Sequence, residues 1–163
     1  MEFHLERHLS KIAHISLREE KHGDDAVLAV DLKVTADVPN DFLSYLDSTM
    51  KWSLYEKQPG QGELLPDDTH MPHLRHPELG TLAWAGEMSK AAVIIHGAKE
   101  QYDMELTADV GKLRFEPKEG GTVAIVFQVQ IHPNPGQSAA LVVYLGREVP
   151  LSVRPADMSS PGD

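Results

Sequence analysis

The feature that most constrains the fold is the recurrence of large apolar residues at every second position in two segments, 28–38 and 123–131. Successive side chains of a β-strand point to opposite faces of a sheet, so a period of two predicts strands with one buried and one exposed face. The apolar residues are Leu28, Val30, Leu32, Val34, Ala36 and Val38 in the first segment and Val123, Ile125, Phe127, Val129 and Ile131 in the second. A chain with two such strands is predicted to build a sheet that is covered on one side.

Weaker patterns predict partners for these two strands. Residues 11–17 also alternate, and the polar stretch that follows predicts a hairpin with 28–38. Residues 102–109 and 112–115 continue the alternation, and the turn residues after them predict a hairpin with 123–131. Further strands are expected in the short apolar runs 82–88, 91–96 and 148–153.

Two segments are read as helical. Apolar residues at a spacing of 3.6 predict one helix over residues 41–56, with a cap at its first residue or the one before. Residues 138–145 are ambiguous, because the flanking serine and glycine resemble helix caps whereas Val142, Val143 and Tyr144 favour a strand. A short helix is the preferred interpretation there.

These patterns together predict a mainly β protein of the α+β class. The expected architecture is an antiparallel β-sandwich or barrel-like sheet with one main helix and, on the helical reading of 138–145, a second short one. A chain of 163 residues has the size of one domain, which is expected to span residues 1–154. Residues 57–80 are rich in glycine and proline and predict an irregular loop, and residues 155–163 predict a flexible tail.

Composition narrows the classes of function. Lys and Arg total 15 and Asp and Glu total 25, so the formal charge is −10, which argues against a generally basic nucleic-acid binder. The chain has no cysteine, so any metal site would have to use histidines and carboxylates. The first ten residues are charged where a signal peptide would be apolar, and the longest apolar runs are about six residues, so a cytoplasmic protein is expected.

A histidine cluster offers one candidate for chemistry. His70, His73 and His76 recur at a spacing of three, with aspartates just before them, and zinc or nickel would suit such ligands. If Pro72 opens a single helical turn, two of the imidazoles project from the same side. The alternative is a solvated loop that carries histidines without a metal. No other cofactor is expected, and the chain contains no nucleophile elbow, zincin helix, phosphate loop or dinucleotide-binding turn, so an enzyme is not supported.

Two further groups are candidates for binding. Lys33, Lys112, Arg114 and Lys118 are expected on exposed strand faces and in the following turn, where a cationic strip could meet a phosphate-bearing strand or an acidic peptide. Such charges are also the ordinary solvent face of a sheet. Trp52 and Tyr55, near the end of the predicted helix, are the large residues that protein interfaces favour, and the alternative is that both pack on the sheet.

Two stretches, KIAHISLREEKHGDDAVLAVDLKVTADVPNDFLSYLD at 11–47 and FEPKEGGTVAIVFQVQ at 115–130, followed by a leucine-rich segment and the residues 146–149, resemble small uncharacterised proteins of tailed bacteriophages and prophages that are encoded near recombination and replication functions. The resemblance implies a phage product in the host bacterial cytoplasm that acts as an accessory binding protein. It transfers no functional residues, because its motifs are a hairpin and a helix start.

The leading hypothesis is therefore a non-enzymatic phage accessory protein that acts through protein contacts in DNA recombination or replication, or in countering a host defence. Its acidic surface suits partners with basic patches. One alternative is a single-stranded DNA-binding protein, and another is a metal-dependent hydrolase built on the histidine cluster. Open sheet edges also make a homodimer an expectation.

Overall fold

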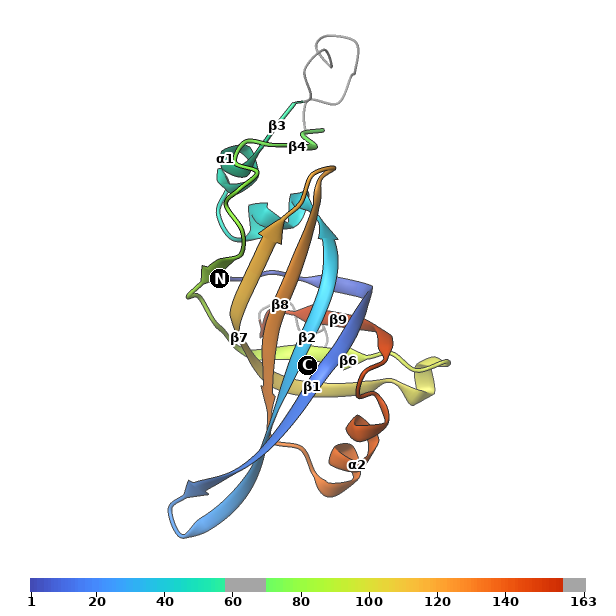
Figure 1. Ribbon diagram of the computed structural model, residues 1–163. Helices are drawn as coiled ribbons and strands as arrows, with labels where there is room; N and C mark the ends of the chain where they lie inside the picture. The colour runs from blue at the N-terminus through green and yellow to red at the C-terminus, as the bar shows by residue number, and fades with distance from the viewer. Residues whose placement is uncertain (58–69, 157–163) are drawn as a thin grey trace.

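The computed structural model describes residues 1–57 and 70–156 of the chain. Its main feature is one antiparallel sheet that closes on itself in the order β7-β6-β9-β1-β2-β8 and back to β7 (Figure 1). The short strand β5 pairs with β7 on the same edge as β6 does. The strands are β1 (Leu5–His22), β2 (Asp25–Pro39), β5 (Leu82–Trp84), β6 (Met88–Ile95), β7 (Met104–Pro117), β8 (Thr122–Ile131) and β9 (Glu148–Arg154). The prediction of a mainly β protein with an antiparallel sheet is confirmed.

The predicted hairpin between the first two strands is confirmed, and it is longer than the alternation indicated. Strands β1 and β2 pair from Ser10 with Ala36 out to His22 with Asp25, and the turn is made by Gly23 and Asp24, with the glycine at a φ of 68°. The end of this hairpin projects beyond the closed part of the sheet (Figure 1). The polar stretch 19–22, read from the sequence as part of the turn, is strand.

The second predicted hairpin closes the sheet. Strand β8 pairs with β2 along one edge and with β7 along the other, so β7, β8, β2 and β1 form one continuous layer at the front of Figure 1. Strands β6 and β9 complete the ring behind it. Because every strand of the ring has a neighbour on both sides, the sheet has few unpaired backbone groups to offer to another chain.

The core lies inside this ring. The inward residues of β2 and β8 are the alternating apolar residues that the sequence marked, and Val30, Leu32, Val34 and Val38 are all at most 2% exposed. Leu28 is the exception, because it is 40% exposed and its neighbour Ala29 is buried instead. Aromatic residues fill the centre, with the Phe3 ring centroid 5.1 Å from that of Phe42 and 5.5 Å from that of Phe127. The fully buried side chains of largest volume are Tyr55, Phe3, Phe115, Phe127, Ile12, Leu32, Leu43, Ile95, Leu113, Ile125, Ile131 and Leu141.

The helical predictions are partly corrected. The single helix expected over 41–56 is broken into a 3-10 helix, η1 (Asn40–Tyr45), and a five-residue helix, α1 (Met50–Leu54). The break has a local cause, since the carboxylate of Asp47 accepts hydrogen bonds of 2.8 and 2.6 Å from the backbone N–H and the hydroxyl of Thr49. Such a side-chain turn competes with a continuous helix.

The preferred helical reading near 138–145 corresponds to the longest helix, α2 (Pro135–Val143). It begins earlier than expected, because Asn134 is its N-cap. The Asn134 side chain accepts from the backbone N–H of Gln137, and the Gln137 side chain accepts from the backbone N–H of Asn134. The buried side chain of Leu141 packs this helix against the core.

The predicted irregular loop 57–80 lies partly outside the described residues, as do residues 157–163 of the predicted tail. In its described part, β4 (His73–Leu74) pairs with β3 (Tyr55–Glu56) as a small separate sheet. Another short helix, η3 (Glu100–Tyr102), precedes β7. No helix in the described ranges is both long enough and apolar enough to cross a membrane.

Candidate functional site

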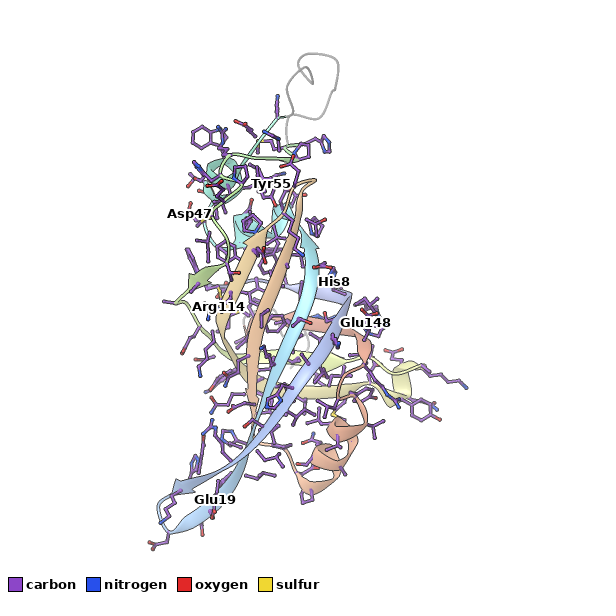
Figure 2. All side chains as sticks on the ribbon, in the orientation of Figure 1. His8, Glu19, Asp47, Tyr55, Arg114 and Glu148 are labelled. Carbon is purple, nitrogen blue, oxygen red and sulfur yellow. The ribbon has the colours of Figure 1, made fainter. Side chains whose placement is uncertain are left out.

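A groove of about 450 Å³ lies on the outer face of the front layer of the sheet. Three of the basic residues singled out in the sequence line it: Lys33 from β2 and Lys112 and Arg114 from β7 (Figure 2 labels Arg114). His14 and Ser16 from β1, Asp31 from β2 and Gln128 from β8 complete its polar lining. The Asp31 carboxylate is paired with Arg18. The fold therefore brings together groups from four strands.

A β-bulge in β7 is responsible for presenting two of these cations on the same face. The register between β7 and β8 shifts between Gly111, opposite Gln128, and Arg114, opposite Val126, so three residues of β7 match two of β8. Lys112 lies in the bulge with a φ of 51°, a left-handed backbone conformation that residues other than glycine rarely adopt. The bulge resets the alternation, so Leu113 is buried while Lys112 and Arg114 are exposed.

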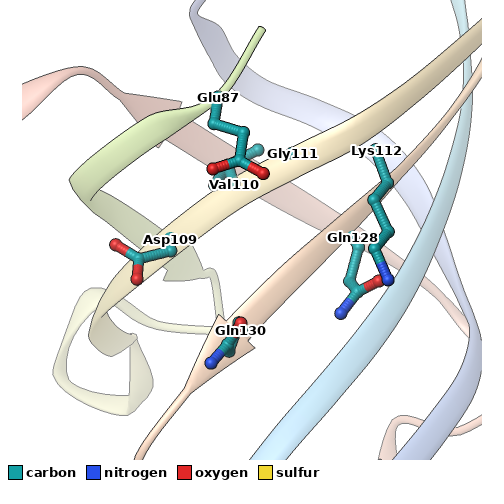
Figure 3. Close-up of a pocket in the computed structure, with 7 residues that line it drawn as sticks. All are labelled: Glu87, Asp109, Val110, Gly111, Lys112, Gln128 and Gln130. Atoms are coloured by element: carbon teal, nitrogen blue, oxygen red, sulfur yellow. The ribbon is translucent and has the colours of Figure 1, made fainter. Parts of the chain in front are cut away.

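The glycine of this bulge lies close to a neighbouring side chain. A Cβ atom at Gly111 would lie 3.0 Å from the Cγ of Glu87, whose side chain crosses over the bulge. Figure 3 shows this crossing, with the side chains of Lys112 and Gln128 next to each other on one side and Asp109 on the other. Glu87 and Asp109 line an adjoining pocket of about 100 Å³, so the cationic groove has an acidic neighbour.

The three cations of the groove have no carboxylate partner among the described residues. This distinguishes Arg114 from Arg18, which pairs with Asp31 at 2.9 Å, and from Arg75, which pairs with Glu56 at 3.2 Å. The charges of Lys33, Lys112 and Arg114 are thus available to an external anion.

The strand register arranges these charges in rows across the sheet. One row holds His14, Lys33, Gln128 and Gly111, with Lys112 beside it in the bulge, and the next row holds Lys11, Thr35, Val126 and Arg114. Acidic residues stand in the rows on both sides: Asp31 and Asp109 on one side, and Asp37 and Glu116 on the other. The result is a cationic strip two rows wide between two acidic borders.

The other predicted binding residues lie elsewhere. Lys118 is exposed in the turn between β7 and β8 and does not line the groove. Trp52 is 62% exposed, and the guanidinium of Arg75 stacks on its ring at 4.8 Å.

Tyr55 is buried, which corrects its assignment to a partner contact. It is 0% exposed, and its hydroxyl lies 2.8 Å from the carbonyl oxygen of Lys118 and 3.1 Å from that of Thr122. The same hydroxyl accepts from the backbone N–H of Lys118 at 2.9 Å. Tyr55 therefore holds the β7–β8 turn onto the core. Of the two readings drawn from the sequence, packing applies to Tyr55.

The structure does not gather His70, His73 and His76 into one cluster. The segment is extended at His73, which lies in β4, so a spacing of three does not place the rings on one side as a helical turn would. His73 is engaged with carboxylates, its Nδ1 lying 3.0 Å from Glu119 and its Nε2 3.6 Å from Glu56. Hydrogen bonds from the Leu74 amide and from His73 lower the pKa of Glu119. Within the described residues, the cluster with metal-ligand spacing is instead Glu20, His22 and His132.

A buried Ser–His–Asp chain is the clearest feature that the sequence did not reveal. His96 Nδ1 lies 3.0 Å from Asp103 Oδ2, and His96 Nε2 lies 2.7 Å from Ser152 Oγ. The residue types are those of a hydrolytic triad, but Ser152 is 0% exposed and its oxygen also accepts from the backbone N–H of Arg7 at 3.0 Å. A substrate cannot reach such a hydroxyl, so this chain of hydrogen bonds ties β1, β6 and β9 together.

Comparison with known proteins adds no assignment to this geometry. No protein-family model matches the chain, and no curated protein and no solved structure matches it either.

Proposed function

We propose that this protein is a non-enzymatic binding protein whose groove holds a short acidic segment of a partner protein. The observation that carries the proposal is the convergence of Lys33, Lys112 and Arg114, none of which has a carboxylate partner in the described chain, on one groove. Arginine and lysine bind carboxylates through charge-assisted hydrogen bonds, which are about twice as strong as neutral ones.

The dimensions of the cationic strip favour a short ligand that crosses the strands. Two rows of a sheet cover roughly 7–10 Å along the strands, and four strands span about 15–20 Å across them. An anionic segment lying across β7, β8 and β2 would meet all three cations. A ligand that continued along the strands would meet the carboxylates of Asp31 and Asp109 or of Asp37 and Glu116. These acidic borders select against a long polyanion.

The chemistry of the lining favours a peptide over a single-stranded nucleic acid. Proteins that bind single strands combine cations with exposed aromatic rings on which the bases stack. The aromatic residue lining this groove is Phe127, and it is 1% exposed because its ring belongs to the core. Gln128 supplies instead an amide that can hydrogen-bond a peptide backbone or a carboxylate.

We further propose that this binding serves an accessory role in the host bacterial cytoplasm, as the resemblance to tailed-bacteriophage proteins implies. The partner would then be a component of phage DNA recombination or replication, or of a host defence. An acidic tail or linker on such a protein fits the cationic strip, and the formal charge of −10 on the whole chain suits a partner that also has a basic surface.

The test measures binding of a fluorescent hexaglutamate peptide at low salt by anisotropy. The double variant Lys33→Gln/Arg114→Gln should weaken binding at least about tenfold, because each charge-assisted hydrogen bond contributes roughly 1.5–3 kcal/mol. Lys118→Gln is the matched control, since it removes one exposed positive charge outside the groove and should leave the affinity unchanged.

An oligothymidylate of the same charge is titrated in parallel. Tighter binding of the oligonucleotide, weakened by the same double variant, would replace the peptide with a single nucleic-acid strand as the ligand. The proposal is overturned if neither probe binds at low salt, or if Lys118→Gln weakens peptide binding as much as the double variant does.

A further inference from the structure

We propose that Glu20, His22 and His132 form a binding site for a divalent transition-metal ion, with Zn²⁺ as the ion that their chemistry fits best. The site lies where the β1–β2 hairpin leaves the closed sheet and β8 ends, and none of its three residues lines the cationic groove. It rests on different residues from those of the proposed function, so either can fail without the other.

Three potential ligand atoms converge on one point. Glu20 Oε2 lies 3.2 Å from the Nε2 of His22 and 2.9 Å from the Nε2 of His132. The two imidazole rings meet edge to face, with centroids 5.8 Å apart. All three ligand atoms lie within 4.8 Å of one another.

The topology explains how residues so far apart in sequence meet. Glu20 and His22 are two apart on β1, so their side chains leave the same face of the strand. His132 follows directly on Ile131, the last residue of β8, which pairs with Val30 of β2. Because β2 lies between β1 and β8, the hairpin carries Glu20 and His22 over the end of β8.

The second oxygen of Glu20 is held by other groups. Arg18 Nη1 donates to Glu20 Oε1, and Gln130 Nε2 donates to the same oxygen at 3.3 Å. Arg18 is itself fixed by Asp31 at 2.9 Å. Outer partners of this kind orient the ligands of metal sites, and here they turn Oε2 toward the two imidazoles.

Both imidazoles approach the same oxygen of the Glu20 carboxylate, Oε2. Without metal, the two Nε2 atoms point hydrogens at one oxygen. A bound cation would take the place of those hydrogens, and each neutral imidazole would carry its proton on Nδ1.

The spacing fits a cation of ordinary size. Two donor atoms that are each about 2.0–2.2 Å from a zinc ion lie about 3.0–3.5 Å apart, close to the 2.9 and 3.2 Å found between Glu20 and the imidazoles. Two histidines and one carboxylate leave at least one coordination position for water. That composition is typical of catalytic zinc sites, because structural sites use four protein ligands. His22 and His132 are both exposed, so the open position faces solvent.

The experiment uses the full chain without a histidine tag. Zn²⁺ is titrated by calorimetry, and Co²⁺ is titrated by its visible absorption, which reports the coordination geometry directly. One equivalent of each ion should bind, and Glu20→Gln and His132→Gln should each weaken Zn²⁺ binding at least tenfold. Circular dichroism of the variants without metal verifies that they fold.

His76→Gln serves as the control, because this histidine is exposed and lies outside the cluster. This variant should bind one equivalent of Zn²⁺ with unchanged affinity. The proposal fails if no stoichiometric binding occurs, if several weak equivalents bind and Glu20→Gln leaves them unchanged, or if His76→Gln abolishes binding while His132→Gln does not.

Discussion

His96 Nε2 lies 2.7 Å from the Oγ of Ser152, and both side chains are buried in the wall of the closed sheet. All the hydrogen-bonding groups in this contact are satisfied when Nδ1 of His96 carries the proton and donates to Asp103. Nε2 then accepts from the Ser152 hydroxyl, whose oxygen accepts from the backbone N–H of Arg7. The network joins β6 to β9 and fixes the β1 bulge, in which Arg7 has a φ of 45°.

Replacing Ser152 with alanine should therefore lower the free energy of unfolding by about 1–3 kcal/mol. The change leaves the buried Nε2 of His96 without a partner and removes the acceptor of the Arg7 N–H, and an unsatisfied buried polar group costs about that much. Urea unfolding followed by circular dichroism measures the difference. Ser53→Ala is the control, because Ser53 is exposed and donates only to the carbonyl oxygen of Thr49, and it should change stability by less than about 0.5 kcal/mol. Equal effects of the two changes would contradict the buried network.

The same network predicts how stability responds to acid. Burial raises the pKa of Asp103, but hydrogen bonds from the Gly97 N–H and from His96 outweigh it, so the pKa lies below its usual value in the folded protein. A carboxyl whose pKa is lower in the folded state stabilises the fold at pH values above its unfolded pKa, near 4. That stabilisation is lost as the pH falls through the lower folded value.

Unfolding free energies measured between pH 7 and pH 3 should accordingly fall less steeply for Asp103→Asn than for the unmodified protein. Asp24→Asn, in the exposed β1–β2 turn, is the matched control and should follow the unmodified protein. A steeper acid dependence in Asp103→Asn would mean that the carboxyl is not held ionised by these bonds.

The strands were predictable because their signal is local. The alternation in β2 and β8 follows directly from one buried and one exposed face, so the core residues Val30 to Val38 and Val123 to Ile131 could be read from spacing alone. The outward position of Lys33 follows from the same pattern, and that of Lys112 and Arg114 from the local alternation in 112–115, which the bulge makes possible. Their convergence on one groove does not, because it depends on β8 pairing with β2 on one side and β7 on the other.

The features that were missed depend on contacts between distant residues. Ser152 and His96 are separated by 56 positions and Glu20 and His132 by 112, so no short motif marks either pair. The predicted helix 41–56 failed for a different reason. The apolar residues do recur at helical spacing, but the side-chain turn at Asp47 interrupts the helix. The hydrogen bond from the Tyr55 hydroxyl to the carbonyl oxygen of Lys118 holds the end of the segment at the β7–β8 turn.

A substitution of Lys112, in the strained bulge of β7, should change stability and peptide binding in opposite directions. Lys112 and Lys90 both lie at register shifts, in β7 and β6, with φ values of 51° and 55°. A residue other than glycine destabilises the fold by about 1–2 kcal/mol when its backbone is left-handed. Glycine removes this strain, but ordering its more flexible backbone costs about 0.5–1 kcal/mol in chain entropy. Lys112→Gly and Lys90→Gly should each raise the free energy of unfolding, measured in urea, by about 0.5–1 kcal/mol.

Only Lys112→Gly should also weaken binding of the acidic peptide, because Lys112 lines the groove and Lys90 does not. If both variants bind the peptide as the unmodified protein does, Lys112 is not part of the binding site, and its left-handed backbone serves only to reset the strand.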